Sequence, residues 1–505
     1  MPANSATSDS QQPDGANAGW LSADRMLLLA LVGLALLRSL ALAISPLELG
    51  VDEAQYWLWS TGFDFGYYTK PPLTSWIIGL SHTLFGHHEW AVRLPAAWLH
   101  LATALCLWRA AFWLAGPGVG PLAGRLAAII WMTLPTVALG SFVMSTDTPL
   151  LLCWSAGLMA LVGVITGQLP QTRGMALAGA AFGAAMLAKY AAIYGLFGLG
   201  LFAIFTRRED GAAITLRGFA MFVVGMVVLA SPNILWNMAN ELTTVRHLGD
   251  NANLDRQSYS IGNSLGFLGV QFATAGPVVF ALMFGVLRAR RDHKASMLML
   301  CLSVPPILVI MIQAFLSEAN ANWALTAMPA LVLWLAQWLV TARTWLGRLA
   351  IGVNLALSAA LLAVTMAGSL GPLTPDSDPL RRLRGWQQLA IDAEAAMTSH
   401  QASTVIADRR ATAALLSWHF HNKTINGRDI TVLVVDADSR PSNHFEQNLA
   451  WQPAPGRRLI LLDGQAVPPP LAGVDWQPGT PALSQTIISH DRTRRHHIHL
   501  GVEGG

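Results

Sequence analysis

Two adjacent carboxylates, Asp52 and Glu53, follow a run of apolar residues at 26–44 that is long enough to cross the hydrocarbon core of a bilayer. The loop continues with several aromatic residues and then Lys70, which precedes two prolines. Charged side chains at the membrane boundary are costly unless they line a polar cavity or meet a charged partner. The simpler interpretation is an interfacial loop with a belt of Tyr and Trp. Such a belt needs neither paired acids nor Lys-Pro-Pro, so we treat this loop as a candidate site.

The composition places most of the chain in lipid. Only 12% of the 505 residues are charged, against roughly 25% in a typical soluble domain, and 53% are hydrophobic. The net charge of +3 is small and no basic run resembles a nucleic-acid patch, so we expect no nucleic-acid partner. The three cysteines lie inside apolar runs without Cys/His ligand spacing, which predicts neither a disulfide framework nor a zinc cluster.

Apolar runs recur along the chain and predict a polytopic α-helical membrane protein with about eleven spans. Residues 122–142 and 262–287 are each expected to form one span, whereas 175–205 could be one long helix or two short ones. Residues 73–85 are apolar but short, and should lie at the interface or re-enter the membrane. We predict a disordered cytoplasmic N-terminus over residues 1–24 and a transmembrane domain over 25–370. The exoplasmic first loop of that domain covers 46–90.

The distribution of basic residues orients these helices. With a cytoplasmic N-terminus, most arginines and the basic cluster at 288–294 fall inside, as the positive-inside rule requires. The outside loops then hold the unusual polar residues, including Asp52, Lys70, Lys189 and Asp147. We therefore expect a site at the outer boundary of the membrane.

From residue 371 the composition becomes polar, and residues 371–505 are expected to form an exoplasmic α/β domain. Apolar runs at 404–407, 430–435 and 459–462 predict strands, and a helical pattern covers 385–397. Residues 494–499, rich in Arg and His, are expected to be a solvated tail, with a metal site as the alternative.

The acids and lysines suggest group transfer. A carboxylate desolvated at the membrane boundary gains basicity and can take a proton from an acceptor. One dominant base fits inverting better than retaining glycosyl transfer. Structural alternatives remain open: Glu53 could complement a helix dipole, and Lys70 and Lys189 could extend to the head groups. The lysines could equally pair with a lipid phosphate.

Other outside residues extend the candidate site. Asp147 begins a span and could act there or only cap the helix. Arg246 could contact a phosphate, or be a solvated loop charge. The residues expected to bind substrate are Tyr56, Tyr67, Tyr68, Asp147, Tyr190, Asn237, His247, Asn322 and Trp323.

Taken in order, these motifs resemble a known family. They comprise the Asp-Glu pair with Tyr56 and Trp57, then residues 67–72, 145–149, 189–190, 232–237 and 321–323, and in the C-terminal region residues 385–386, 407–409 and 443–445. The set is similar to the bacterial relatives of dolichyl-phosphate-mannose protein mannosyltransferases, which include the lipid A aminoarabinose transferases. The resemblance covers most of the chain.

The resemblance implies a GT-C membrane glycosyltransferase with a polyprenyl-phosphate sugar donor. It implies that Asp52 activates the acceptor and that Lys70 and Lys189 lie near the donor phosphate. The aminoarabinose transferases carry an acid before that first lysine and a basic residue three positions after the aspartate. Here these are Thr69 and Gln55, which argues against a metal at this loop and against aminoarabinose as the sugar. No cofactor is evident.

We therefore predict an inverting glycosyltransferase of the bacterial inner membrane with its site on the periplasmic side. It would use an undecaprenyl-phosphate type of donor, and the acceptor would be lipid A, a protein or another glycan, with Asp52 or Glu53 as the base. Two other classes stay open: a transporter or flippase of lipid-linked glycans, and a non-catalytic lipid-binding relative.

Overall fold

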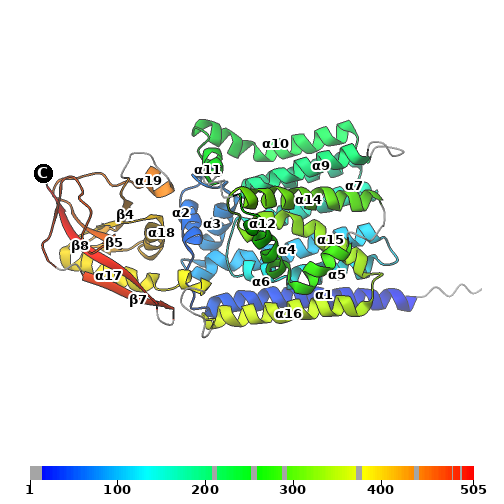
Figure 1. Ribbon diagram of the computed structural model, residues 1–505, viewed down its shortest axis with the longest axis horizontal. Coiled ribbons are helices and arrows are strands. Elements are labelled where there is room, and N and C mark those ends of the chain that lie inside the picture. Colours follow the sequence, from blue (N-terminus) through cyan, green and yellow to red (C-terminus); the bar gives the residue numbers. More distant parts are fainter. Residues whose placement is uncertain are drawn as a thin grey trace, which may run out of the picture.

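The computed structural model describes residues 14–206, 213–251, 259–286, 293–370, 378–436, 443–479, 482–489 and 492–504. Within these residues the chain forms an elongated bundle of apolar helices and a C-terminal domain built on a sheet (Figure 1). The short helices α2 (Val51–Ser60) and α3 (Leu73–Phe85) lie at the end of the bundle that faces this domain. The first loop thus lies between the two parts of the molecule.

The bundle contains long helices that run roughly side by side along its length (Figure 1). Its elements are α1 (Asp14–Ile44), α4 (Glu89–Ala115), α5 (Gly120–Thr133), α6 (Pro135–Gly140), α7 (Asp147–Ile165), α8 (Gln171–Ala188), η1 (Tyr190–Ala192), α9 (Ile193–Thr206), α10 (Leu216–Ala239), α11 (Thr243–Asn251), α12 (Ile261–Ala275), α13 (Pro277–Val286), α14 (His293–Leu316), η2 (Ala321–Ala327), α15 (Met328–Leu339) and α16 (Thr344–Ala367).

Six of the described helices are long and apolar enough to cross a membrane, or seven if α12 and α13 count as one bent span. The other bundle helices are shorter or less apolar, so the expected number of about eleven spans stays a prediction. Residues 122–142 were expected to form one span; they divide into α5 and α6 at Leu134, which precedes Pro135. Proline disfavours a helical conformation in the residue before it, which explains the break.

Residues 262–287 were expected to form one span; the described part of this range divides into α12 and α13, which meet at an angle of 109°. Gly276 joins them with φ +83°, a conformation that favours glycine. A Cβ there would lie 1.8 Å from the side-chain oxygen of Asn354 on α16, whose amide nitrogen donates to the carbonyl of Ala275. The bend is therefore held by a side chain that satisfies backbone freed at the break.

Close helix packing explains the cohesion of the bundle in lipid. Gly179 of α8 lies against the backbone of Phe222 in α10, where a Cβ would approach the Phe222 carbonyl to 2.0 Å. Small residues allow such contact between helices, which association in membranes requires.

The N-terminal part of α1 differs from its expectation. The helix begins at Asp14, inside the stretch 1–24 for which disorder was predicted, and Asp24 pairs with Arg125 of α5 at 2.6 Å. Disorder is therefore the wrong prediction for residues 14–24. Residues 1–13, and residues 288–292 of the basic cluster, lie outside the described residues.

The C-terminal domain is a small α/β fold. Its central strand β1 (Thr404–Ala407) lies parallel between β4 (Thr431–Val434) and β5 (Arg458–Asp463), so the strands expected at these positions are confirmed. The other elements are η3 (Pro379–Leu383), α17 (Trp386–His400), α18 (Arg410–His419), β2 (Thr424–Ile425), β3 (Arg428–Asp429), α19 (His444–Asn448), β6 (Val474–Trp476), β7 (Ala482–Ser489) and β8 (Arg492–Glu503).

The expectation of a solvated tail at residues 494–499 is wrong. These residues belong to β8, which pairs antiparallel with β5, β6 and β7 in the interior of the sheet. His496 and His499 are buried, and the Arg494 guanidinium lies 3.6 Å above the ring of Trp386. Residues 494–499 are therefore held by sheet pairing and by the cation–π contact of Arg494, although their composition suggested that they would be exposed to solvent.

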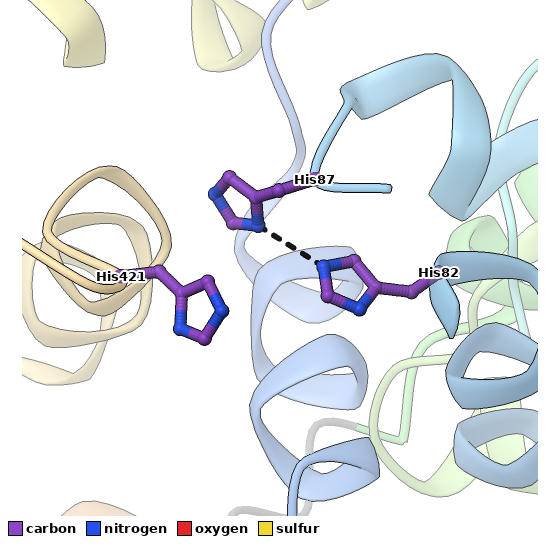
Figure 2. Close-up of side chains that lie close together, drawn as sticks. All are labelled: His82, His87 and His421. Carbon is purple, nitrogen blue, oxygen red and sulfur yellow. Dashed lines mark hydrogen bonds between the residues drawn. The ribbon is translucent and has the colours of Figure 1, made fainter. Parts of the chain in front are cut away.

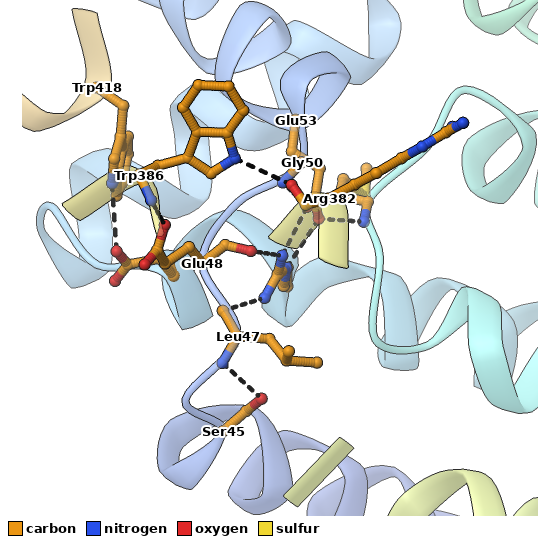
Figure 3. A network of polar contacts seen from close by, with 11 residues as sticks. Ser45, Leu47, Glu48, Gly50, Glu53, Arg382, Trp386 and Trp418 are labelled. Carbon is orange, nitrogen blue, oxygen red and sulfur yellow. Dashed lines mark hydrogen bonds and ion pairs between the residues drawn. The ribbon is translucent and has the colours of Figure 1, made fainter. Parts of the chain in front are cut away.

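One hydrophobic core joins the two parts of the molecule. Trp57 of α2 and Trp418 of α18 belong to the same buried cluster, and their rings meet edge to face at 4.9 Å. Glu48, just before α2, accepts hydrogen bonds from the backbone N–H groups of Gly385, Trp386 and Gln387 at the start of α17. Figure 3 shows Glu48 beside Trp386. A carboxylate at a helix N-terminus is stabilised by the free N–H groups there, so Glu48 holds α17 against the first loop.

Candidate active site

Glu53 is the structural member of the acidic pair. Its side chain is buried and receives the guanidinium of Arg93 from α4 at 2.9 Å and 2.7 Å. The backbone N–H groups of Gly50 and Met144 also donate to it, at 2.8 and 3.0 Å. Both carboxylate oxygens are therefore occupied, and Glu53 has the contacts of an anchor rather than of a base that meets a substrate.

Arg93 extends this anchor to the loop that precedes α2. Its two terminal nitrogens donate to the carbonyls of Leu47 and Glu48 at 2.9 and 2.7 Å. The guanidinium thus fixes the entry to α2, while Glu53, its partner in a bidentate ion pair, accepts from Met144 in the segment before α7.

Asp52 has a different environment, because neighbouring residues on a helix point about 100° apart. Its side chain is 66% exposed, and its Oδ1 pairs with Arg410 at the start of α18. The same arginine donates to the side-chain oxygen of Gln55 at 2.5 Å. Among the described residues Asp52 Oδ2 has no hydrogen-bond partner. Asp52 is therefore the carboxylate of the pair that an acceptor can reach.

A cavity of about 300 Å³ opens beside this loop, and both predicted lysines line it. Lys70 comes from the first loop and Lys189 from the junction of α8 and η1. Apolar side chains of α14, including Val309 and Ile310, and Trp323 of η2 complete the wall. The cavity therefore joins a cationic end to an apolar wall, which suits an amphipathic ligand with an anionic head.

The charge on Lys70 is not neutralised within the described residues, where its ammonium group has no hydrogen-bond or ion-pair partner. Burial lowers the pKa of Lys70, and the nearby charge of Lys189 lowers it further, whereas Asp52 and Asp147 oppose the shift. Lys70 and Lys189 line the same cavity, and Asp147 contacts Lys189 directly. Two cations brought together in this way form a natural site for an anion such as a phosphate.

Asp147 holds Lys189 in place. One carboxylate oxygen accepts from Lys189 Nζ at 2.7 Å, and the other accepts from the Asn322 amide at 2.6 Å. Asp147 is the first residue of α7, but Thr146 is the N-cap and no side chain makes a capping hydrogen bond there, so the interpretation of Asp147 as a cap is wrong. Of the predicted pair, Trp323 lines the cavity, and Asn322 supports Lys189 through Asp147.

Tyr190 lies beside Lys189 in a polar network. Its hydroxyl donates to the side-chain oxygen of Asn233 at 2.7 Å and accepts from the amide of Asn237 at 2.9 Å. The Asn233 amide in turn donates to the carbonyl of Phe65 in the first loop at 2.7 Å. Three segments distant in sequence therefore fix the wall of the cavity.

Some predicted residues take other places. Tyr67 is buried, stacks on Trp59 at 4.8 Å and bonds to backbone carbonyls, which is a packing role. Arg246 is exposed on α11 and pairs with Glu241 at 3.2 Å, and it does not line the cavity. The side chain of His247 lies outside the described residues. Tyr56 is buried near Asp52, and Tyr68 is half-buried in the loop.

Sequence reasoning missed Arg93 and Arg410. Arg93 stands inside an apolar helix, where an unexplained charge signals a buried partner. Arg410 follows a short apolar strand, at the carboxyl end of β1, where α/β sheets commonly place ligand contacts. Neither signal names the partner, because each partner lies on a distant segment.

Comparison with known proteins identifies relatives of this chain. The family model described as dolichyl-phosphate-mannose-protein mannosyltransferase matches residues 69–236, which include both lysines and Asp147. The lipid A galacturonosyltransferase RgtD of Rhizobium johnstonii is 32% identical over 466 residues, or 89% of this chain and 94% of that protein.

Solved structures show the same fold. ArnT from Cupriavidus metallidurans in the apo state superposes with a TM-score of 0.62 at 14% identity, over 96% of this chain and 98% of that one. The same protein bound to undecaprenyl phosphate gives a TM-score of 0.61 at 14% identity, over 94% and 97%. The chain is thus a multi-pass membrane protein of the GT-C class with a small C-terminal α/β domain.

The chain belongs to the GT-C superfamily of membrane glycosyltransferases, in the group that contains protein mannosyltransferases and RgtD. It is a glycosyltransferase, as its sequence predicts.

The two acids should respond differently to neutralisation. We expect Glu53→Gln to destabilise the protein by about 3–5 kcal/mol, because it leaves Arg93 buried without its counter-ion. Asp52→Asn should change stability by less than about 1 kcal/mol, since exposed ion pairs contribute little. Unfolding monitored by intrinsic tryptophan fluorescence in detergent compares the two variants with wild type. Equal destabilisation by both would contradict these separate environments.

Proposed function

We propose that this enzyme transfers a sugar from a polyprenyl-phosphate donor of the undecaprenyl type to an acceptor in the cell envelope, such as lipid A. The observation that carries the proposal is the cavity lined by both Lys70 and Lys189, of which Lys70 lies on the same loop as the exposed carboxylate of Asp52. The relatives support it, since one is named a lipid A transferase and the other was solved with undecaprenyl phosphate. We place the enzyme in a bacterial inner membrane, with this site and the C-terminal domain on the periplasmic side.

The donor would enter from the lipid. Val309 and Ile310 present apolar surface to a prenyl chain, and the lysine ammonium groups receive its phosphate. The sugar then projects from the phosphate toward the first loop. Asp147 and Asn322 keep Lys189 directed at the phosphate through the contacts described above. Lys70 has no ion-pair partner among the described residues, so a bound anion would stabilise its charge more than that of Lys189.

The transfer reaction needs one base and a stabilised leaving group. Asp52 takes the proton from the acceptor hydroxyl or amine, and the freed electron pair forms the new bond to the anomeric carbon. The bond from that carbon to the phosphate oxygen breaks, and the polyprenyl phosphate leaves with the electron pair. Lys70 and Lys189 stabilise the charge that develops on it. Attack from the face opposite the phosphate inverts the anomeric centre.

Arg410 belongs to this mechanism as a positioning residue. It holds Asp52 Oδ1 and Gln55 together, so that Oδ2 of the carboxylate faces away from this contact. An acceptor that carries phosphates or carboxylates would meet the guanidinium as it approaches the base. This arrangement favours an anionic acceptor over a neutral one.

Loss of the base should abolish turnover without loss of donor binding. For Asp52→Asn we expect transfer to fall at least about a hundredfold, the scale of losing a general base. The assay uses radiolabelled undecaprenyl-phosphate sugars, with a membrane extract as acceptor and protein in nanodiscs. Asp64→Asn, which changes another acid of the same loop, is the matched control and should keep its activity. Equal turnover in wild type and Asp52→Asn would remove Asp52 from the chemistry.

The lysines are tested by binding rather than by turnover. Lys70→Met and Lys189→Met should each weaken binding of undecaprenyl phosphate about tenfold or more, because a charge-assisted contact to phosphate contributes about 1.5–3 kcal/mol. Arg246→Met removes an exposed cation outside the cavity and should bind as wild type does. Native mass spectrometry or microscale thermophoresis measures the three affinities. Unchanged binding in both lysine variants would refute the placement of the phosphate.

A further inference from the structure

Three histidines converge where the first loop meets the C-terminal domain, at a place the transfer mechanism does not use. His82 lies in the last turn of α3, His87 in the connection to α4, and His421 just after α18. Figure 2 shows the three rings turned toward one another from the two sides of the junction. His82 and His421, which are far apart in sequence, thus contribute to one cluster.

The spacing of the ring nitrogens suits a metal ion. One nitrogen from each ring lies within 4.8 Å of the other two, and His82 Nε2 lies 3.2 Å from His87 Nδ1. Imidazole nitrogens bound to zinc lie about 2.0–2.1 Å from the ion. At a tetrahedral angle this places two nitrogens roughly 3.3–3.4 Å apart. The His82–His87 pair already has about this separation, and a bound ion would draw the His421 nitrogen in from within 4.8 Å of the other two.

The surroundings of His87 are those of a metal ligand. Its Nε2 lies 3.0 Å from the carbonyl oxygen of Trp418, so that Nε2–H donates and Nδ1 keeps its lone pair toward His82. Histidine ligands commonly donate their second N–H to a backbone carbonyl, which fixes ring orientation and tautomer. The His87 ring also stacks on Trp418, with centroids 3.7 Å apart.

A wall of aromatic groups keeps all three rings in place. The Trp57 indole meets His82, His87 and His421 edge to face, with centroids 5.9, 5.1 and 5.0 Å away. These contacts hold the rings in the orientation in which their nitrogens converge.

A packing cluster is the alternative account. It explains the stacking and the single contact between His82 and His87. It gives no reason for a third imidazole, from the C-terminal domain, to bring a ring nitrogen within 4.8 Å of the other two. A bound cation would use one nitrogen of each ring.

We propose that His82, His87 and His421 bind a zinc ion that joins the first loop to the C-terminal domain. The fourth position is left to water. Because α18 carries Arg410 at its start and precedes His421, the ion fixes the far end of the helix whose near end contacts Asp52. The proposal does not depend on the identity of the donor or acceptor.

Zinc content tests the site directly. Tag-free protein is stripped with EDTA, loaded with zinc chloride, dialysed, and measured by inductively coupled plasma mass spectrometry. Wild type should retain about one zinc per chain. His82→Ala and His421→Ala should bind at least about tenfold more weakly in a chelator competition, since even outer-shell changes cost that much. His88→Ala removes an exposed neighbouring imidazole and should retain zinc as wild type does.

X-ray absorption of the zinc-loaded wild type gives a result that needs no variant. We expect nitrogen neighbours at about 2.0–2.1 Å, with the outer scattering of imidazole rings. Oxygen ligands alone would overturn the proposal, as would zinc content at background in wild type. Equal zinc affinity in wild type and both cluster variants would also overturn it.

Discussion

The buried ion pair between Glu53 and Arg93 is the interaction on which the site depends. A lone charge in this position would cost several kcal/mol, so each residue requires the other. The pair also makes hydrogen bonds with the backbone of residues 47, 48, 50 and 144. The start of α2, the linker before it and the start of α7 consequently share one fixed point.

This ion pair explains why the adjacent acids Asp52 and Glu53 have different environments. With Glu53 directed inward, the helix turns Asp52 outward to the surface that faces α18. The loop then carries Lys70 back to the end of the bundle, where Asp147 presents Lys189. Donor and acceptor sides of the site are thus built from separate elements that the ion pair holds in register. The shared hydrophobic core and Glu48 bring the C-terminal domain to the same place.

Local patterns in the sequence predict much of the fold. Apolar runs indicate the membrane helices, and short runs of Val, Ile and Leu indicate β1, β4 and β5, because burial imposes those compositions. The bend at Gly276 was not predicted, since the residue that requires it, Asn354, lies on another helix. Residues 494–499 were wrongly expected to be solvated, because strand pairing and the Trp386 ring cannot be read from composition.

Within the site, motif order indicated the two lysines and Asp52 as candidates. It could not separate Asp52 from Glu53, because Arg93 and Arg410 reach them only through tertiary contacts.

A structure of this enzyme with undecaprenyl phosphate tests the central claim most directly, because the account places one phosphate between two named ammonium groups. Cryo-electron microscopy of the protein in nanodiscs with this lipid should show the phosphate within about 3 Å of Lys70 and Lys189, the distance of a charge-assisted hydrogen bond. The prenyl chain should run along Val309 and Ile310. A phosphate bound elsewhere, with both lysines turned away from it, would contradict the account.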